Sequence, residues 1–407
     1  MGFRRLKRFL KDKTEPDLSR VQETITLRVD PAYDGWRVDL FLAELMNWHS
    51  RTKIQKLIQE GKVLKNNRRT FPGRKVRTGD EILLKLPPPD PEDFRVLQEG
   101  TLDIVYEDEH IVVINKPANL LVHPVGGRRF SSVINILHKY YRDPENPKKD
   151  IVPIIAHRID VETSGALLAV KNRKLRKKIA NLFAQRKIKK KYLAIVEGHL
   201  PAKELFVDLP IGERLKHEIK IARGINFSEG QPAQTIFRLY KRLVGFDVVE
   251  CELLTGRQHQ IRVHLEAVGN PLLCDPYYGV RRFLAEEDVA KIKAGKDEKA
   301  KRYTREYYDF FKTLKKIELD KTSYYFLDDI PPEVVFSTKY LHELETANAN
   351  SPIGFSRVNV SQENYLISRT ALHSWKLEFV HPATNELISI EAPVPADIKR
   401  VIDALSD

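Results

Sequence analysis

The feature that most limits the possible folds of this chain is a series of strand-like runs, rich in apolar residues, that begins after residue 100. Each run is bounded by turn-forming residues, which is typical of buried strands. The runs are 102–116, 151–156, 165–170, 191–198, 246–256 and 375–393. Helical spacing of apolar residues appears near 133–142 and 173–185. Strands at irregular intervals with helices between them predict an α+β domain, with a mixed, largely antiparallel sheet and flanking helices.

A smaller module precedes this domain. Apolar residues recur at helical spacing over 38–45 and over 54–58, which predicts two short amphipathic helices. Ser50 is the expected N-cap of the second helix, Gly61 its expected end, and Gly79-Asp80 a later turn. Short strands after Gly61 complete a predicted small α/β module.

The length of 407 residues predicts two or three domains. The proline-rich, acidic run "PPPDPED" predicts a stiff linker after the module. Dense mixed charge late in the chain predicts a helical insertion. The predicted organisation is a basic arm at 1–20, the module at 21–90, the linker at 91–101, the larger domain at 102–280 and 363–407, and the insertion at 281–362.

The charge and cysteine content restrict the partners and the compartment. A net charge of +13 predicts a polyanionic partner, with nucleic acid first and an acidic membrane surface as the alternative. No apolar run reaches the roughly 18 residues of a membrane-spanning helix, the N-terminus lacks the apolar core of a secretory signal, and no large amphipathic anchor is present. The two cysteines, Cys251 and Cys274, cannot form a disulfide framework or a four-cysteine metal site. They predict a reducing, cytoplasmic location.

Basic residues follow the polar faces of the two module helices: Arg37, Arg51, Lys53 and Lys56. On charge alone a solvated surface explains them. The order of elements, with Arg-x-Asp, Ser-Arg, Gly-x-Val and Gly-Asp, resembles the alpha-L RNA-binding motif shared by a small-subunit ribosomal protein and tyrosyl-tRNA synthetases. This resemblance implies that the four residues bind RNA. That family usually has Val-Asn-Gly after the helix and this chain has "LKNN" at 64–67, so a different turn is expected.

Polar residues of the larger domain gather in three segments, 157–164, 186–198 and 253–279. Taken singly, each has a structural explanation. Asp160 is explained as a cap of the next turn, and Tyr192 as an edge residue with a buried ring. The polar–apolar alternation over 260–265 fits a strand with one wet face, and a helix is the alternative. The histidines have no acidic or cysteine partner at ligand spacing, so no metal site is predicted.

Taken together, the segments resemble a known family. The strings are "KPANLLVHP", "HRIDVETSGALLAVKN", "KKYLAIVEG", "TGRQHQIRVHLEAVGNPLLCDPYYG" and "ALHSWKLEFVHPATNELISIEAP". They resemble the RluA-type pseudouridine synthases over 102–278 and again from Ser368. The sister RsuA-type branch has a different later arginine motif.

The resemblance implies a reaction and the residues that perform it. Such enzymes break the bond between ribose and a uracil nitrogen, turn the base and rejoin it through a ring carbon, without a cofactor. Asp160 takes the position of the catalytic carboxylate, and Arg262 forms a salt bridge with it. Tyr192 stacks on the uracil. Arg158, two residues from Asp160 on an extended segment, fills the space left by the flipped base.

The resemblance also implies RNA contacts around this site. The stretch 171–191 holds 11 Lys or Arg among 21 residues and no acidic residue, which favours phosphate contacts. The residues of the larger domain predicted to bind RNA are Arg158, His157, Lys116, Arg257, Gln260, Lys189 and Lys190.

The sequence therefore predicts an RNA uridine isomerase. The expected substrate is large-subunit ribosomal RNA; transfer RNA and a non-catalytic role in ribosome assembly are the alternatives. The expected partners are RNA and pre-ribosomal particles, and the expected state is a monomer. Two departures from the family pattern are Asn119 and Cys274, which replace glycines.

Overall fold

The computed structural model describes residues 24–46, 51–85, 91–125, 128, 130–143, 146, 149–214, 222–297 and 365–406. The predictions for the arm at 1–20, for Ser50 and for most of the insertion concern residues outside this description. The chain forms two compact units, one from 1–102 and 120–155 and the other from 103–119 and 156–407. Among the described residues, no helix has the length and apolar character needed to cross a membrane.

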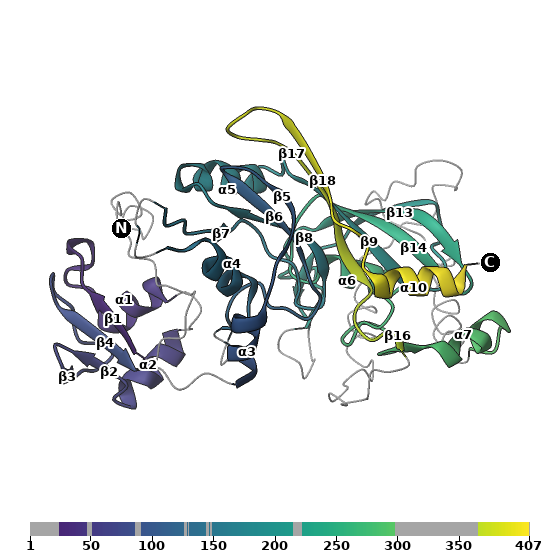
Figure 1. Ribbon diagram of the computed structural model, residues 1–407. Coiled ribbons are helices and arrows are strands. Elements are labelled where there is room, and N and C mark those ends of the chain that lie inside the picture. The colour runs from purple at the N-terminus through teal and green to yellow at the C-terminus, as the bar shows by residue number, and fades with distance from the viewer. Residues whose placement is uncertain are drawn as a thin grey trace. The chain divides into compact units, whose positions relative to one another are not determined.

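The first unit contains the predicted α/β module (Figure 1). Its elements are β1 (Thr24–Arg28), the 3-10 helix η2 (Pro31–Tyr33), α1 (Val38–Leu45), α2 (Arg51–Gln59), β2 (Val63–Lys65), β3 (Arg68–Arg69) and β4 (Glu81–Lys85). The strands form a sheet in the order β1-β4-β2-β3. Apolar residues of both helices pack with those of the strands into one core, which confirms the two predicted amphipathic helices.

Two turns of the module show why its residues suit their positions. Asn66 and Asn67 join β2 to β3 with φ of 49° and 60°, the positive values that a two-residue hairpin turn requires. Asparagine tolerates this conformation better than most residues, so the chain makes a tight turn here without glycine. Gly61, just after α2, and Gly79 also have positive φ, at the predicted helix end and turn.

The rest of the first unit differs from the predicted linker. Residues Pro91–Glu99 form helix α3. Proline is favoured at the first helical position and acidic residues in the first turn, so "PED" starts a helix as well as it would continue a linker. Helix α4 (Val133–Tyr141) lies within the range predicted to be helical, and the short strand β7 (Ile154–Ile155) ends the unit.

The second unit is built on a mixed sheet whose central path runs β10-β13-β14-β9-β17-β8-β6-β5. Its strands are β5 (Asp103–Glu107), β6 (Ile111–Lys116), β8 (Ser164–Val170), β9 (Lys189–Glu197), β10 (Glu204–Asp208), β13 (Gln234–Leu243), β14 (Phe246–Leu253) and β17 (Leu372–Val380). Strand β18 (Leu387–Glu391) pairs with β17, and β11 (Ile211–Glu213) pairs with β12 (Arg223–Ile225). Only the β17–β8 pair of the central path is parallel, so the predicted fold class is confirmed.

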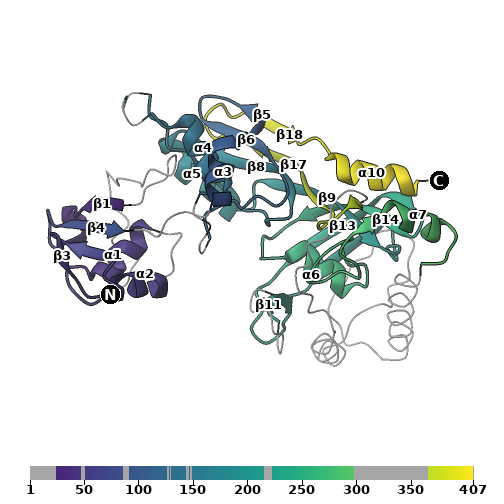
Figure 2. The ribbon, with the colours of Figure 1, turned by 60° about the horizontal axis from the view of Figure 1, so that its bottom comes forward.

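Helices flank this sheet (Figure 2). Successive residues of β9 point to alternate faces of the sheet. Leu193 and Ile195 pack into a core with residues of α10 (Ala396–Leu405). Tyr192, one residue away, points to the opposite face. The remaining helices of the unit are η3 (Arg173–Leu175), α5 (Arg176–Ala184), α6 (Gln260–Ala267) and α7 (Glu286–Lys293).

The start of the predicted insertion packs with a segment of the larger domain that follows it in the sequence. Strand β15 (Leu284–Ala285) pairs with β16 (Tyr365–Ile367), and Leu284, Leu366 and Ile367 are buried in the core that includes α10. Helix α7 agrees with the predicted helical character. The aromatic, basic run at 302–316 lies outside the described residues.

Gly165 is required where β8 meets β17. Its φ is +104°, and a Cβ added there would lie 2.2 Å from the carbonyl oxygen of Ser374. We expect Gly165→Ala to lower the free energy of unfolding by roughly 3 kcal/mol or more, because backbone strain and a backbone clash add together.

The matched control is Gly245→Ala, which has φ +77° but only an ordinary contact, 3.5 Å from Ile292. Gly245→Ala should lower the free energy of unfolding by about 1–2 kcal/mol, because it adds only the strain of a residue with positive φ. Denaturant unfolding of both variants measures the difference, and equal losses would contradict the role assigned to the clash.

Candidate active site

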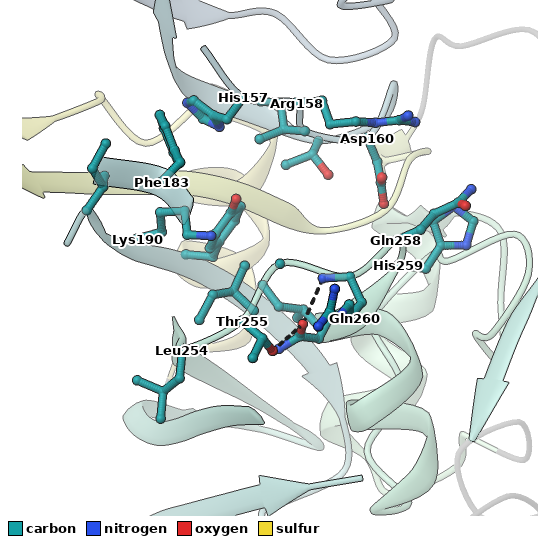
Figure 3. A pocket seen from close by; sticks show the side chains of 18 of the residues that line it. His157, Arg158, Asp160, Phe183, Lys190, Leu254, Thr255, Gln258, His259 and Gln260 are labelled. Atoms are coloured by element: carbon teal, nitrogen blue, oxygen red, sulfur yellow. Dashed lines mark hydrogen bonds between the residues drawn. The ribbon is translucent and has the colours of Figure 1, made fainter. Parts of the chain in front are cut away.

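A pocket of about 530 Å³ opens on the sheet face opposite α10, and all its lining residues belong to the second unit. Its walls come from the segment 156–163, the end of α5, the start of β9 and the stretch 253–262. Figure 3 shows Arg158 and Asp160 together on one wall, with Gln258 and His259 on the neighbouring wall. Arg158 and Asp160 therefore lie on one wall of the pocket, as their spacing along an extended segment predicts.

The carboxylate of Asp160 faces this pocket and is not used as a cap. The backbone carbonyl of Asp160, rather than its side chain, accepts the hydrogen bond from the Thr163 amide. One side-chain oxygen accepts a hydrogen bond from Arg262 Nη1 over 3.3 Å, and the side chain remains 20% exposed. Asp160 thus keeps a partly accessible carboxylate beside a fixed cation.

Arg262 is the buried cation, and its main partner is Asp275. Nε and Nη2 of the guanidinium donate to the two Asp275 oxygens, each over 2.7 Å, which leaves Nη1 for Asp160. Burial acts to lower the pKa of Arg262, but the charges of Asp275, Asp160 and Glu162 raise it above its usual value. The rings of Tyr277 and Tyr278 lie 5.2 and 5.1 Å from the guanidinium carbon. Arg262 is therefore a permanently charged, immobile group.

Segment 260–265 forms helix α6, so the strand interpretation of its alternation is wrong. All eight residues of α6 are buried, and each polar one has its own internal partner. Gln260 bonds Thr255, Arg262 bonds Asp275, His264 bonds Thr235, and Glu266 bonds Arg214. The alternation marks internal hydrogen bonds, not a wet face.

Two buried cations hold the backbone that follows Asp160. Lys116 Nζ donates to the carbonyl of Val161 over 3.0 Å, and Arg369 Nη1 donates to that of Glu162 over 3.3 Å. Arg369 is in turn held by both oxygens of Asp397 at the start of α10. Burial, with the charge of Arg369, lowers the pKa of Lys116 to about 7, and Asp160 opposes this. Lys116 was predicted to bind RNA; its side chain is fully buried, so that prediction is wrong.

The Glu162 carboxyl lies in the same buried group. Burial raises its pKa, while Arg262 and a hydrogen bond from the Thr370 hydroxyl act in the opposite direction. The result is a carboxyl that is held in place and is harder to ionise than an exposed one. Among the described residues, no group of histidine, cysteine and acidic side chains could hold a metal ion.

Tyr192 lines the pocket from β9, with Ser374 and Cys251 as its register partners on the flanking strands. Burial raises the pKa of its phenol above the usual 10; Asp160 adds to this rise and Ser374 opposes it. The hydroxyl is therefore protonated at neutral pH. The ring can offer a stacking surface and a hydrogen-bond donor, but the phenol is a poor base.

Two further residues predicted to bind RNA, His157 and Gln260, have hydrogen-bond partners within the protein. His157 Nε2 accepts a hydrogen bond from the Leu168 amide, and burial, with Lys190, lowers the pKa of His157 to about 3. Gln260 uses all its amide hydrogens and both oxygen lone pairs within the protein, with Thr255, Arg257, Gln234 and Thr235 as partners. Its amide has no group left for RNA, so that prediction is wrong.

The other predicted RNA-binding residues of this unit divide between two faces. Arg158, Lys190 and Arg257 line the pocket. Burial lowers the pKa of Lys190. Lys189, one residue away on β9, instead pairs with Glu378 over 2.7 Å, as alternation along the strand requires.

Sequence reasoning missed Asp275, Glu162, Arg369 and His259. Asp275 and His259 lie within the motif "TGRQHQIRVHLEAVGNPLLCDPYYG". An acidic residue and a histidine close in sequence to Arg262 could have indicated that both belong to the site. The Tyr278 hydroxyl accepts from the Arg223 amide and can donate to His259 Nδ1 over 2.8 Å. Burial and the charge of Arg262 lower the pKa of His259 to about 4, so the pocket holds a neutral imidazole.

In the first unit, the four predicted RNA-binding residues are all exposed: Arg37, Arg51, Lys53 and Lys56. Arg37 and Arg51 both donate to the fully buried carboxylate of Asp39. These two guanidinium groups therefore have fixed orientations at the surface.

Comparison with known proteins agrees with both parts of the chain. Residues 110–267 match the family model "RNA pseudouridylate synthase", and residues 36–82 match the S4 domain. The chain is 36% identical over 249 residues to the Bacillus subtilis protein named "Uncharacterized RNA pseudouridine synthase YlyB", covering 60% of this chain and 80% of that protein. It is 28% identical over 388 residues to the "Ribosomal large subunit pseudouridine synthase D" of Neisseria meningitidis, covering 95% and 83%. The Zymomonas mobilis protein of the same name is 36% identical over 248 residues, covering 60% and 77%. The chain therefore belongs to the RNA pseudouridine synthase family, isomerases that act on RNA, and carries an N-terminal S4 RNA-binding domain.

Proposed function

We propose that the chain converts specific uridines of large-subunit ribosomal RNA to pseudouridine, with Asp160 as the catalytic carboxylate. The observation that carries the proposal is the position of Asp160, partly exposed in a pocket and bonded to a guanidinium that Asp275 fixes. The reaction is an isomerisation: the bond from ribose C1′ to uracil N1 breaks, a bond from C1′ to C5 forms, C5 loses a proton and N1 gains one. No atom enters or leaves overall.

Asp160 acts by its negative charge beside the ribose. Positive charge develops at C1′ as the bond to N1 breaks, and a fixed carboxylate beside it stabilises that charge. Arg262 holds Asp160 in place through its Nη1 hydrogen bond. Asp275 matches the charge of Arg262, so that the guanidinium does not neutralise the site. Lys116 and Arg369, by holding the next two carbonyls, keep the carboxylate in one orientation.

The target uridine must leave its stack to reach this pocket. Flipping costs a few kcal/mol and least where the base is already unpaired. The proposed role of Tyr192 is to stack on the flipped uracil with its ring. Arg158, exposed beside Asp160, takes the space that the base vacates, because a guanidinium can stack on neighbouring bases and attract phosphate.

Ribosomal RNA is proposed because two of the relatives carry that substrate in their names. Chemical mapping of pseudouridine in ribosomal RNA from cells that lack the chain tests this. Loss of pseudouridine at one or a few positions, restored by the wild-type chain and not by Asp160→Asn, supports the proposal. An unchanged ribosomal map with lost transfer RNA pseudouridine would overturn the substrate.

RNA in pre-ribosomal particles and a cytoplasmic location form part of the same proposal. Both cysteines are unpaired and buried, which fits a reducing compartment. We also propose that one chain acts alone.

A set of exposed cations, the cationic rim, extends from the end of the pocket. It comprises Arg173, Lys174, Lys177, Arg186 and Lys187. We expect Lys177→Gln with Lys187→Gln to reduce the slope of log affinity against log salt by about 1.4, since each single-strand phosphate contact contributes about 0.7. Binding titrations at several salt concentrations, with ribosomal and transfer RNA, measure the slope.

The matched control for the rim is Lys189→Gln. Its ammonium already pairs with Glu378, so the salt slope should change little. An equal change in slope per lysine removed, about 0.7 for the control, would show that the rim has no special part in binding.

A further inference from the structure

A surface at the start of α1 combines fixed cations with an exposed aromatic ring. We call it the Phe71 surface, and it comprises Arg37, Arg51, Phe71, Arg74 and Lys75. Phe71 is 67% exposed, so its ring lies at the surface. All five residues belong to the first unit.

The turn that carries Phe71 is fixed to α1 by backbone hydrogen bonds. The Arg74 amide closes the turn onto the Phe71 carbonyl over 2.9 Å. The Val38 amide donates to the Arg74 carbonyl over 2.8 Å, and the Val76 amide donates to Trp36 over 2.8 Å. The backbone that carries the ring is therefore already ordered. A ligand that covers the ring loses little free energy to ordering of this loop.

The two arginines beside this turn are oriented by Asp39. Arg37 donates to both Asp39 oxygens over 3.0 and 3.1 Å, and Arg51 Nε donates over 3.0 Å. Burial acts to raise the pKa of Asp39, but these bonds and one from Gln55 lower it overall, so Asp39 is ionised. One carboxylate serves two guanidinium groups that remain 44% and 48% exposed. Two guanidinium charges therefore share one carboxylate charge, which leaves a net charge of +1 in this group. Arg74 and Lys75 add to the positive charge of the surface.

We propose that the Phe71 surface binds an unpaired nucleotide of RNA, with its base stacked on Phe71 and its phosphates paired with Arg37 and Arg51. This rests on the proposed RNA-binding role of the module and adds the kind of nucleotide that it selects. A base within a duplex has both faces covered by its neighbours, so only an unpaired base can stack on the ring. An aromatic ring among cations is the combination that single-stranded nucleic acid requires.

The test compares two RNAs of equal length, a hairpin with an unpaired loop and a fully paired duplex. Both are titrated with the full chain carrying Asp160→Asn, so that turnover does not enter the measurement. We expect Phe71→Ala to weaken binding of the loop RNA by about 5- to 150-fold, the range for one stacked base, and to change duplex binding little. Phe71→Tyr should restore loop binding, whereas Phe71→Leu, which is apolar without a π-face, should not.

Tyr140→Ala is the matched control, because Tyr140 is 64% exposed on α4 and is not part of the surface. It should leave both affinities unchanged. Thermal unfolding of Phe71→Ala must match that of the parent chain. Three results would overturn the proposal: wild-type affinity of Phe71→Ala for the loop RNA, an equal loss of affinity on both RNAs, or wild-type affinity of Phe71→Leu for the loop RNA. Tritium release from 5-tritiated uridine in a short stem-loop tests the catalytic proposal separately, so its failure would leave the binding result standing.

Discussion

Asp160→Asn is expected to reduce turnover by more than about 10⁴-fold while leaving RNA affinity within a few-fold, because it removes the reacting charge without changing the shape of the pocket. The amide oxygen can still accept the hydrogen bond from Arg262, so the local structure should persist. Single-turnover kinetics and binding titrations on the same RNA separate the two effects.

The matched control is Asp103→Asn, which neutralises a carboxylate bonded to Asn115 that is not among the pocket residues. It changes the net charge by the same amount and should leave turnover within two-fold or so of the wild type. Substantial turnover by Asp160→Asn would remove Asp160 from the mechanism.

Arg262→Lys is expected to lower kcat by about 10²- to 10³-fold, the scale for loss of one fixed electrostatic group. Lysine keeps the charge but cannot bond both Asp275 oxygens and Asp160 at once. Removal of one partner from a buried ion pair costs roughly 3–5 kcal/mol of stability. Arg262→Lys should lower the free energy of unfolding by part of this amount. Steady-state kinetics on the folded fraction and denaturant unfolding measure the two losses.

Arg281→Lys provides the comparison that separates stability from catalysis. Arg281 is as buried as Arg262 and is held in the same way by Glu197 and Asp297, but it is not among the pocket residues. Its lysine variant should lose similar stability and keep its kcat. Equal losses of kcat in both variants would show that Arg262 acts only through the fold.

The sequence predicted the strands, the module and the pocket wall because those features depend on local pattern. Apolar runs mark buried strands, and spacing along an extended segment put Arg158 and Asp160 on one side. The strand predicted for the α6 segment was wrong because both faces of that helix are buried. Its polar residues recur every second position only because each has a partner elsewhere in the chain.

Partners distant in sequence explain most of what was missed. Asp275 holds Arg262 from 13 residues away, and Arg369 bonds the Glu162 carbonyl from 207 residues away. No periodicity could reveal such pairs. Lys116 was predicted to bind RNA because its charge was visible in the sequence and its burial was not.

The two departures from the family pattern do have a local explanation. Asn119 and Cys274 both have positive φ, 64° and 60°, which is the conformation that glycine adopts most easily. Asparagine tolerates this conformation. Cys274 is buried among apolar residues of the core that includes α10, and this packing offsets the strain of its backbone.

Tritium release tests the central claim most directly. Ribosomal and transfer RNA transcripts carrying tritium at carbon 5 of uracil are incubated with the wild-type chain and with Asp160→Asn. Formation of the C1′–C5 bond expels that tritium into water. The proposed mechanism predicts release from ribosomal RNA by the wild-type chain and none by Asp160→Asn; release that is equal in both, or absent from every RNA with the wild-type chain, would contradict it.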